Sequence, residues 1–227
     1  MVKRYYRGLL PMAIALAFPV AAHAREDRQL WLTGAATVDL GEKWRISEEA
    51  IARFSDNRNG LYEIENNLLL GYRLTNMVAI WAGYTHDPLY AGGRFTVMEH
   101  RAREQVTVDN FVKLGPGKLS ARLRLEQRWR EGVNGTAWRF RPFIRYAVPL
   151  GKGGTSLQLS HESFIDLNAT GYQQVHGEER MRNLVAVRTP LSKKVNLEVG
   201  YLNQYGFVPG GQDNDDHVAS LSLNFTF

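Results

Sequence analysis

Alternating arginine side chains make Leu119–Val148 the stretch of this sequence with the most evident chemistry. In LSARLRLEQRWRE, polar and charged residues occupy every second position from Ser120 to Arg130, and mostly apolar residues lie between them. WRFRPFIRYAV repeats the pattern a few residues later. A guanidinium group can bridge two carboxylates or hold a small anion. The chemistry that this pattern indicates is therefore ion pairing or anion binding.

A second candidate site is His161-Glu162-Ser163. On a strand, His161 and Ser163 would share the apolar face with Leu157 and Leu159, because side chains two residues apart point the same way. A histidine beside a serine is the start of an acyl-hydrolase site. The sequence offers no unambiguous acidic partner on that face, so a polar pair near a strand end remains the simpler interpretation.

Other chemical signatures are absent from the sequence. It contains no G-x-S-x-G elbow, H-E-x-x-H zinc motif, phosphate-binding loop or calcium-binding loop. The acidic run Asp213–Asp216 is expected to be a solvated loop, with weak cation binding as the alternative. We expect no metal, no cofactor and no enzymatic activity.

The alternation that presents these residues has the period of β-strands. Most of the expected strands are about ten to thirteen residues long, which suits tilted strands that cross a membrane. No amphipathic helix interrupts them, which excludes parallel α/β folds. The expected strands are Gln29–Leu40, Lys43–Ser55, Leu61–Arg73, Met77–His86, Glu99–Leu114, Lys118–Glu131, Thr136–Pro149, Thr155–Ile165, Glu179–Pro190, Val195–Phe207 and Asp216–Phe227.

The connections between these strands fall into two alternating classes. Tight turns are expected at Gly41-Glu42, Leu74–Asn76, Gly115–Gly117, Gly151–Gly154 and Ser192–Lys194, and longer loops at Asp56–Gly60, Asp87–Met98, Gly132–Gly135, Asp166–Glu178 and Val208–Asp215. Outer-membrane barrels have short periplasmic turns and longer outer loops. All six lysines after residue 24 lie at or beside the tight turns. The tight turns are therefore predicted to form the periplasmic rim.

Aromatic residues of the apolar face gather near both ends of the strands, with aliphatic residues between them. Two such girdles are expected where a surface crosses lipid. The alternative is a soluble barrel or sandwich with an aromatic interior. The predicted girdle consists of Trp44, Phe54, Tyr62, Tyr72, Tyr84, Trp129, Trp138, Tyr146, Tyr205 and Phe225.

The opposite face would then line the lumen with charged residues. These are Glu63, Glu65, Arg101, Arg122, Arg124, Glu126, Arg128, Arg139, Arg141, Arg145, Glu162 and Glu198, together with Arg45, Glu49, Arg53 and Arg103. One interpretation is an ion-pair network that fills and stiffens a narrow barrel. The other is that unpaired arginines of the 122–145 hairpin line a narrow passage or an anion site.

The N-terminal segment has the features of a secretory signal peptide. Lys3, Arg4 and Arg7 precede a short apolar run, and Ala22-His23-Ala24 resembles a cleavage site. We expect a signal peptide at 1–24 and a barrel domain at 25–227. The remaining 25 basic and 23 acidic residues give a net charge of +2, which argues against nucleic-acid binding. No cysteine is present, so a disulfide framework is excluded.

The number of strands is the part of the expected architecture that leaves alternatives open. Eleven candidates can be delimited, but single-chain bacterial barrels use an even number. We therefore expect an antiparallel up-and-down barrel of ten or twelve strands. Either one strand is wrongly split near Gly41, or another lies hidden in Asp87–Met98 or Asp166–Glu178. The last strand ends on Phe227, which resembles the signal read by the barrel assembly machinery of the outer membrane.

Several short motifs occur in an order that resembles one bacterial family. They are Trp31, EHR (99–101), RLRLEQR (122–128), RFR (139–141), HESF (161–164), RMRN (180–183) and EVGYLNQ (198–204). This order is similar to that of domain of unknown function 2490, over nearly the whole mature chain. The resemblance implies an outer-membrane barrel and no established activity. It also implies that Glu162 and Phe164 are the typical positions within HESF.

Together these features predict an all-β transmembrane barrel in a Gram-negative envelope, monomeric in outer-membrane lipid and lipopolysaccharide. Its predicted role is structural, or that of a porin-like narrow conduit for small polar or anionic solutes. The alternatives are a lipid-facing acyl hydrolase that uses His161 and Ser163, and a soluble periplasmic binding barrel.

Overall fold

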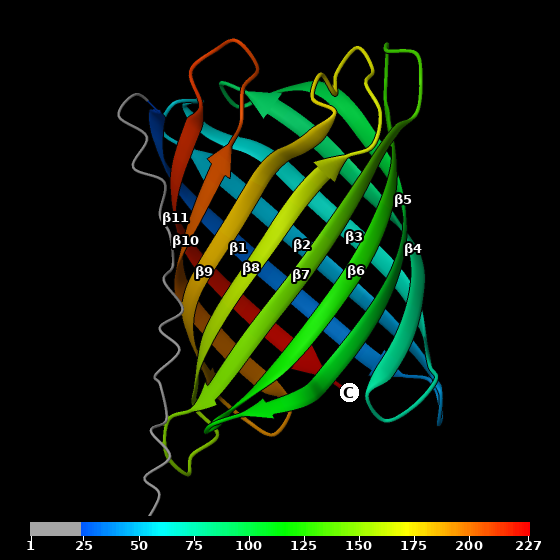
Figure 1. The fold of residues 1–227 in the computed structure, drawn as a ribbon, viewed down its shortest axis with the longest axis vertical. Coiled ribbons are helices and arrows are strands. Elements are labelled where there is room, and N and C mark those ends of the chain that lie inside the picture. The colour runs from blue at the N-terminus through cyan, green and yellow to red at the C-terminus, as the bar shows by residue number, and fades with distance from the viewer. Residues whose placement is uncertain (1–23) are drawn as a thin grey trace, which may run out of the picture.

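The computed structural model describes residues 24–227, and they form one closed β-barrel (Figure 1). Apart from Ala24, the expected signal peptide lies outside the described residues. The strands are β1 (Arg25–Asp39), β2 (Trp44–Ser55), β3 (Gly60–Arg73), β4 (Val78–Ala91), β5 (Arg94–Leu114), β6 (Gly117–Arg130), β7 (Ala137–Pro149), β8 (Ser156–Asp166), β9 (Gly177–Pro190), β10 (Val195–Gly206) and β11 (Asn214–Thr226). The all-β barrel prediction is confirmed.

The barrel has eleven strands, so the expectation of ten or twelve is wrong. Consecutive strands pair antiparallel, and the barrel closes between β1 and β11. With an odd number of alternating strands, the first and the last must run in the same direction. β1 and β11 accordingly pair in parallel, in unbroken register from Arg25↔Asn214 to Thr37↔Thr226. The fully antiparallel arrangement expected from the sequence is therefore corrected at this one seam.

Neither segment suspected of hiding an extra strand contains one. The expected loop Asp87–Met98 instead extends β4 and β5 into one long hairpin that turns at Gly92 and Gly93. Both glycines have positive φ (56° and 73°), a conformation that other residues adopt at a cost. The segment between β8 and β9 contains a single isolated bridge, Thr170↔Gln173.

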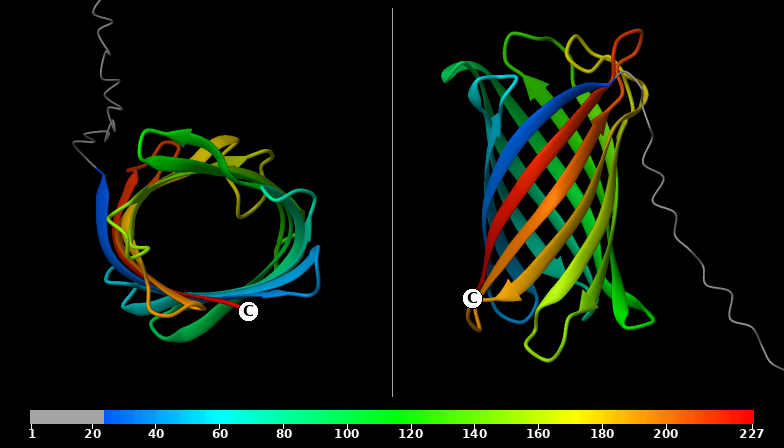
Figure 2. Two further views of the ribbon diagram at one scale, coloured as in Figure 1. Left: turned by 90° about the horizontal axis from the view of Figure 1, so that it is seen from below. Right: turned by 90° about the vertical axis from the view of Figure 1, so that its left-hand side faces the viewer.

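The two rims of the barrel differ less in the length of their connections than the sequence predicted. The two longest connections, 167–176 and 207–213, lie at one rim, but so do 56–59 and 92–93, which are as short as the turns of the other rim. We call the rim that carries the segments after β2, β4, β6, β8 and β10 the loop rim, and the opposite one the turn rim (Figure 1). The chain enters β1 at the loop rim and ends at the turn rim (Figure 2, right). No helix in residues 24–227 is long and apolar enough to cross a membrane.

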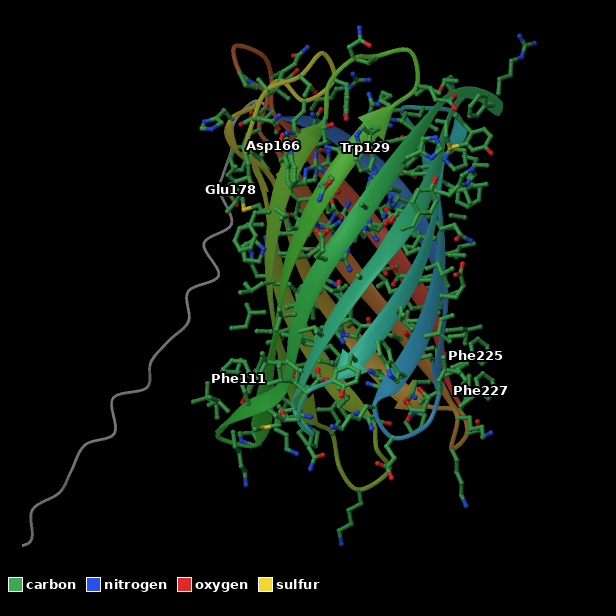
Figure 3. All side chains as sticks on the ribbon, turned by 90° about the vertical axis from the view of Figure 1, so that its right-hand side faces the viewer. Phe111, Trp129, Asp166, Glu178, Phe225 and Phe227 are labelled. Atoms are coloured by element: carbon green, nitrogen blue, oxygen red, sulfur yellow. The ribbon has the colours of Figure 1, made fainter. Side chains whose placement is uncertain are left out.

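The distribution of polarity is the reverse of that in a water-soluble globular protein. Outward apolar side chains such as Leu68, Leu123 and Val199 are 47%, 52% and 50% exposed. Most of the buried side chains are polar or charged, and polar atoms fill the inside of the barrel (Figure 3). A small apolar cluster of Trp31, Leu202 and Val218 lies on the inner wall formed by β1, β10 and β11.

Candidate functional site

A continuous ion-pair network lines the barrel interior from β2 to β8. Near the loop rim, Glu99 accepts hydrogen bonds from Arg101 (Nε to Oε1, 2.8 Å), Arg128 (Nε to Oε1, 2.8 Å) and Arg130 (Nη2 to Oε2, 2.7 Å). Arg101 also pairs with Asp87. One carboxylate thus holds three guanidinium groups from two neighbouring strands.

The network continues across the middle of the barrel. Glu65 pairs with Arg53 (2.8 Å) and Arg103 (2.6 Å). Glu126, which is fully buried, pairs with Arg103 (3.0 Å) and with Arg141 (2.7 Å). Each of these buried charges therefore has partners on neighbouring or facing strands, as an interior ion pair requires in order to offset its desolvation.

Towards the turn rim the network ends at Glu162 on β8. Glu162 pairs with Arg141 (3.0 Å) and also with Arg122. Near the loop rim, a separate group joins Arg139 to Asp166 (2.8 Å) and to Glu179 (3.2 Å). Every charged residue predicted to line the lumen lies on the inner face; Glu198 faces Arg188 across the β9–β10 ladder without an ion pair among the described residues.

Aromatic rings and guanidinium groups stack across the lumen on the other side of this network. Arg53 and Arg182 both lie over the Trp31 ring, each 4.5 Å from its centroid. Arg182 also lies 4.5 Å from the Phe164 centroid, and Arg141 lies 4.2 Å from it. We call these five residues the waist. Cation–π contacts of this kind are strongest where water is excluded.

The waist separates two internal cavities. The upper cavity, about 360 Å³, lies towards the loop rim, and the lower cavity, about 600 Å³, lies towards the turn rim. Arg53, Glu65, Arg141 and Arg182 line both, which places them between the two. Ten arginines and five carboxylates line the upper cavity, and seven arginines and four carboxylates the lower. Both cavities therefore have an excess of positive charge.

Away from the loop-rim mouth, the cavity walls include arginines that have no carboxylate partner among the described residues. These are Arg145, Arg182 and Arg188, which take part in none of the ion pairs. Arg182 donates from Nε to Gln204 Oε1 at 2.8 Å, and Arg145 lies over the Phe143 ring. They are the arginines inside the lumen that are most available to a small anion. Only Arg145 belongs to the 122–145 hairpin that the sequence pointed to.

The loop between β8 and β9 (167–176) folds inward over the loop-rim opening (Figure 2, left, yellow). Gln173 is buried, accepts from Arg128 Nη1 (3.0 Å) and donates to the backbone oxygens of Trp138 (3.0 Å) and Asn168 (2.8 Å). Tyr172 donates its hydroxyl proton to the Arg128 carbonyl. Burial raises the pKa of Tyr172, which keeps that hydroxyl protonated. The loop therefore narrows the mouth of the upper cavity.

Most of the predicted girdle residues lie on the outer face. Trp44, Tyr84 and Trp129 are well exposed, while Phe54, Tyr72, Trp138, Tyr146 and Phe225 are partly buried. Phe227 follows β11 at the turn rim and stacks on Phe225, with ring centroids 6.4 Å apart. Labels in Figure 3 place Trp129 at the loop rim and these two phenylalanines at the turn rim.

Two girdle predictions need correction. Tyr62 points into the upper cavity and donates to Gln29 Oε1 at 2.8 Å, because a β-bulge between β2 and β3 shifts the register beside it. Tyr205 is buried, since Phe207 packs against its ring (5.2 Å) and its hydroxyl donates to Asp213 Oδ2 (2.8 Å).

On the outer face, the structure brings a third residue to His161 and Ser163. His161 Nε2 lies 3.2 Å from Ser163 Oγ, and His161 Nδ1 lies 2.8 Å from Asn183 Oδ1. Asn183 is directly opposite His161 in the β8–β9 register. From the sequence, only an acidic residue was considered as the partner of His161, so the Asn183 side-chain amide was not predicted.

Comparison with known proteins places the chain in a family. No solved structure matches the chain. An uncharacterized protein of Methylorubrum extorquens is 27% identical over 240 residues, which cover 97% of each chain. Residues 28–215 match the family model described as "Protein of unknown function (DUF2490)". The resemblance seen in the sequence motifs is confirmed: the chain belongs to the DUF2490 family.

Proposed function

We propose that this protein is an outer-membrane β-barrel with a largely filled lumen that admits small anions through a narrow, gated path. The proposed membrane location is supported by the reversed polarity of the barrel. Its charges are buried inside, and outward residues such as Leu123 and Val199 are half exposed. Soluble monomers rarely expose apolar surface on this scale. In a membrane this apolar outer surface contacts lipid acyl chains, and the backbone N–H and C=O groups of the closed sheet form hydrogen bonds with neighbouring strands.

The anion preference follows from the charge of the two cavities. Arginines outnumber carboxylates in both, and Arg145, Arg182 and Arg188 have no ion-pair partner among residues 24–227. A narrow lumen of low dielectric strengthens the attraction for an anion. The waist and the 167–176 loop limit passage, so the resting conductance is expected to be small.

Planar-bilayer conductance of the refolded protein tests this proposal. An informative variant removes arginines without leaving a carboxylate unpaired. The double variant Arg145→Ala/Arg188→Ala meets this condition. We expect small, anion-biased conductance in the wild type and a weaker bias in this double variant. Arg182→Ala removes the central residue of the waist and should enlarge the conductance. Lys152→Ala/Lys193→Ala, at the turn rim, is the matched control with unchanged conductance.

Two outcomes would contradict the conduit. One is cation preference in the wild type. The other is silence from both the wild type and Arg182→Ala while each shows the heat-modifiable electrophoretic migration of a folded barrel. Silence would leave a purely structural barrel. A chain that stays soluble without detergent after export would contradict the membrane location itself.

A further inference from the structure

The outer face of β8 and β9 carries three side chains in the arrangement of a hydrolase triad. Glu162 and Phe164 on β8 are buried inside the barrel. Strand alternation therefore points His161 and Ser163, which alternate with them, outward. Asn183 reaches the same face from β9, opposite His161.

The hydrogen bonds assign a role to each group. Asn183 Oδ1, 2.8 Å from His161 Nδ1, accepts the Nδ1 proton and fixes the tautomer of the ring. His161 Nε2 then has a free lone pair that faces the Ser163 hydroxyl at 3.2 Å. A nucleophile, a base and a group that orients the base are the elements of a triad, and an asparagine serves as the third member in some proteases.

Two other outward histidines show that this arrangement is not a general feature of the surface. His100 Nδ1 lies 2.5 Å from the Tyr84 hydroxyl, and His217 Nδ1 lies 2.6 Å from the Tyr201 hydroxyl. Both are stacked tyrosine–histidine pairs. Neither pair contains a serine. Among the described residues, only His161 joins a serine hydroxyl to a side-chain amide.

The surroundings of the triad suit a lipid substrate. Exposed apolar side chains flank it: Ile144 on β7 lies directly opposite His161, and Val185 on β9 lies two residues closer to the turn rim than Asn183 does. The β7–β8 ladder is interrupted beside Ser163, opposite Pro142, which carries no N–H.

We propose that Ser163, His161 and Asn183 form an acyl-hydrolase site that cleaves ester-linked acyl chains of membrane lipids. Ser163 Oγ attacks the ester carbonyl while its proton passes to His161 Nε2. The alcohol of the deacylated lipid leaves with that proton, and an acyl-serine remains. Water then attacks the acyl-serine with His161 as base, which releases the fatty acid and restores Ser163. Lipid as substrate depends on the proposed membrane location; the reactivity of Ser163 does not.

A long-chain alkyl fluorophosphonate tests the nucleophile on the refolded protein in detergent. Mass spectrometry is expected to place the adduct on Ser163, with no adduct in Ser163→Ala and at least tenfold slower labelling in His161→Ala. Asn183→Asp should keep the labelling rate because it retains an acceptor, whereas Asn183→Ala should lower it roughly tenfold or more. His217→Ala, which alters a tyrosine–histidine pair, should label like the wild type.

Fatty-acid release identifies the substrate. The protein is incubated separately with mixed micelles of dioleoyl phosphatidylethanolamine and with purified lipopolysaccharide, and free fatty acid is measured. Release from either one that Ser163→Ala abolishes supports the proposal and names the lipid. Absence of both the Ser163 adduct and release, from protein with normal heat-modifiable migration, would overturn it. Conductance is independent of these residues, so failure here leaves the conduit proposal standing.

Discussion

Buried arginines in this barrel have carboxylates or aromatic rings as partners. The kind of partner determines whether a substitution disturbs the charge balance of the interior. Arg103 and Arg141 share the carboxylate of Glu126, whereas Arg182 lies between the rings of Trp31 and Phe164. Loss of this shared carboxylate leaves each of two buried cations with one partner fewer, Arg103 with Glu65 and Arg141 with Glu162. Loss of Arg182 removes a cation that has no carboxylate partner among the described residues, so no counter-charge is left behind.

Glu126→Gln tests how much the shared buried carboxylate stabilises the barrel. The substitution keeps the size of the side chain but leaves Arg103 and Arg141 facing a neutral amide. We expect the free energy of unfolding to fall by about 3–5 kcal/mol, because two buried guanidinium groups each lose a charged hydrogen-bond partner worth about 1.5–3 kcal/mol. Reversible denaturation in lipid vesicles, followed by tryptophan fluorescence, measures the change.

Glu104→Gln is the matched control, because Glu104 lies on the outer face of β5 and forms no ion pair among the described residues. The free energy of unfolding of Glu104→Gln should stay the same or rise, since a charged side chain on the lipid-facing side of a strand is unfavourable. Equal destabilisation by the two substitutions would contradict a structural role for the interior network.

For individual residues, the sequence predicted which side chains point into the barrel but not which groups each of them contacts. Strand alternation alone places Arg141 and Glu162 inside. The partnership of Arg141 with Glu126 and Phe164 depends on how neighbouring strands are staggered, which alternation does not specify. Tyr62 was misplaced for a related reason: a one-residue bulge reverses the face of a side chain, and nothing in the local pattern marks it.

Among the elements, the 167–176 loop is the one whose conformation depends most on the barrel beneath it. Its amide and hydroxyl groups at Gln173 and Tyr172 bond to β6 and β7 rather than to solvent. The sequence predicted a longer connection here, Asp166–Glu178, because this segment lies between two strand-like segments. It did not predict that the loop folds inward, because the acceptors and donors that hold it lie more than thirty residues away.

Gln173→Ala should release this loop while the strands stay intact. The change removes one acceptor and several donor contacts, each worth about 1 kcal/mol. Amide hydrogen exchange within 167–176 is therefore expected to accelerate by tenfold or more, with strand amides unaffected. Gln174→Ala truncates the neighbouring glutamine, which is exposed, and should leave exchange unchanged. Identical exchange in Gln173→Ala and the wild type would show that Gln173 does not hold the loop.

For the whole molecule, the odd number of strands places the two ends of the barrel domain at opposite rims. The sequence contains eleven recognisable strand segments. Ten or twelve strands were predicted only because single-chain bacterial barrels have even strand numbers. The rule assumes antiparallel closure, whereas β1 and β11 close in parallel. With the tight turns in the periplasm, as the lysine distribution predicts, the start of β1 faces the cell exterior.

Amine labelling of intact cells tests this orientation. The reagent is an amine-reactive polyethylene glycol too large to pass through porins. Lys43, Lys113, Lys118, Lys152, Lys193 and Lys194 all lie at or beside the turn rim and should react only after the outer membrane is permeabilised. Asn134→Lys, in the exposed connection between β6 and β7, is the positive control and should react in intact cells.

If the signal peptide is cleaved after Ala24, the amine of Arg25 should react in intact cells as well, because β1 begins at the loop rim. Reaction of Lys152 in intact cells, with Asn134→Lys protected, would mean that the barrel is inserted the other way round. The triad of Ser163 would then lie in the inner leaflet, where phospholipid rather than lipopolysaccharide would be its substrate. The orientation of the barrel therefore determines which lipid the outer-face site can reach.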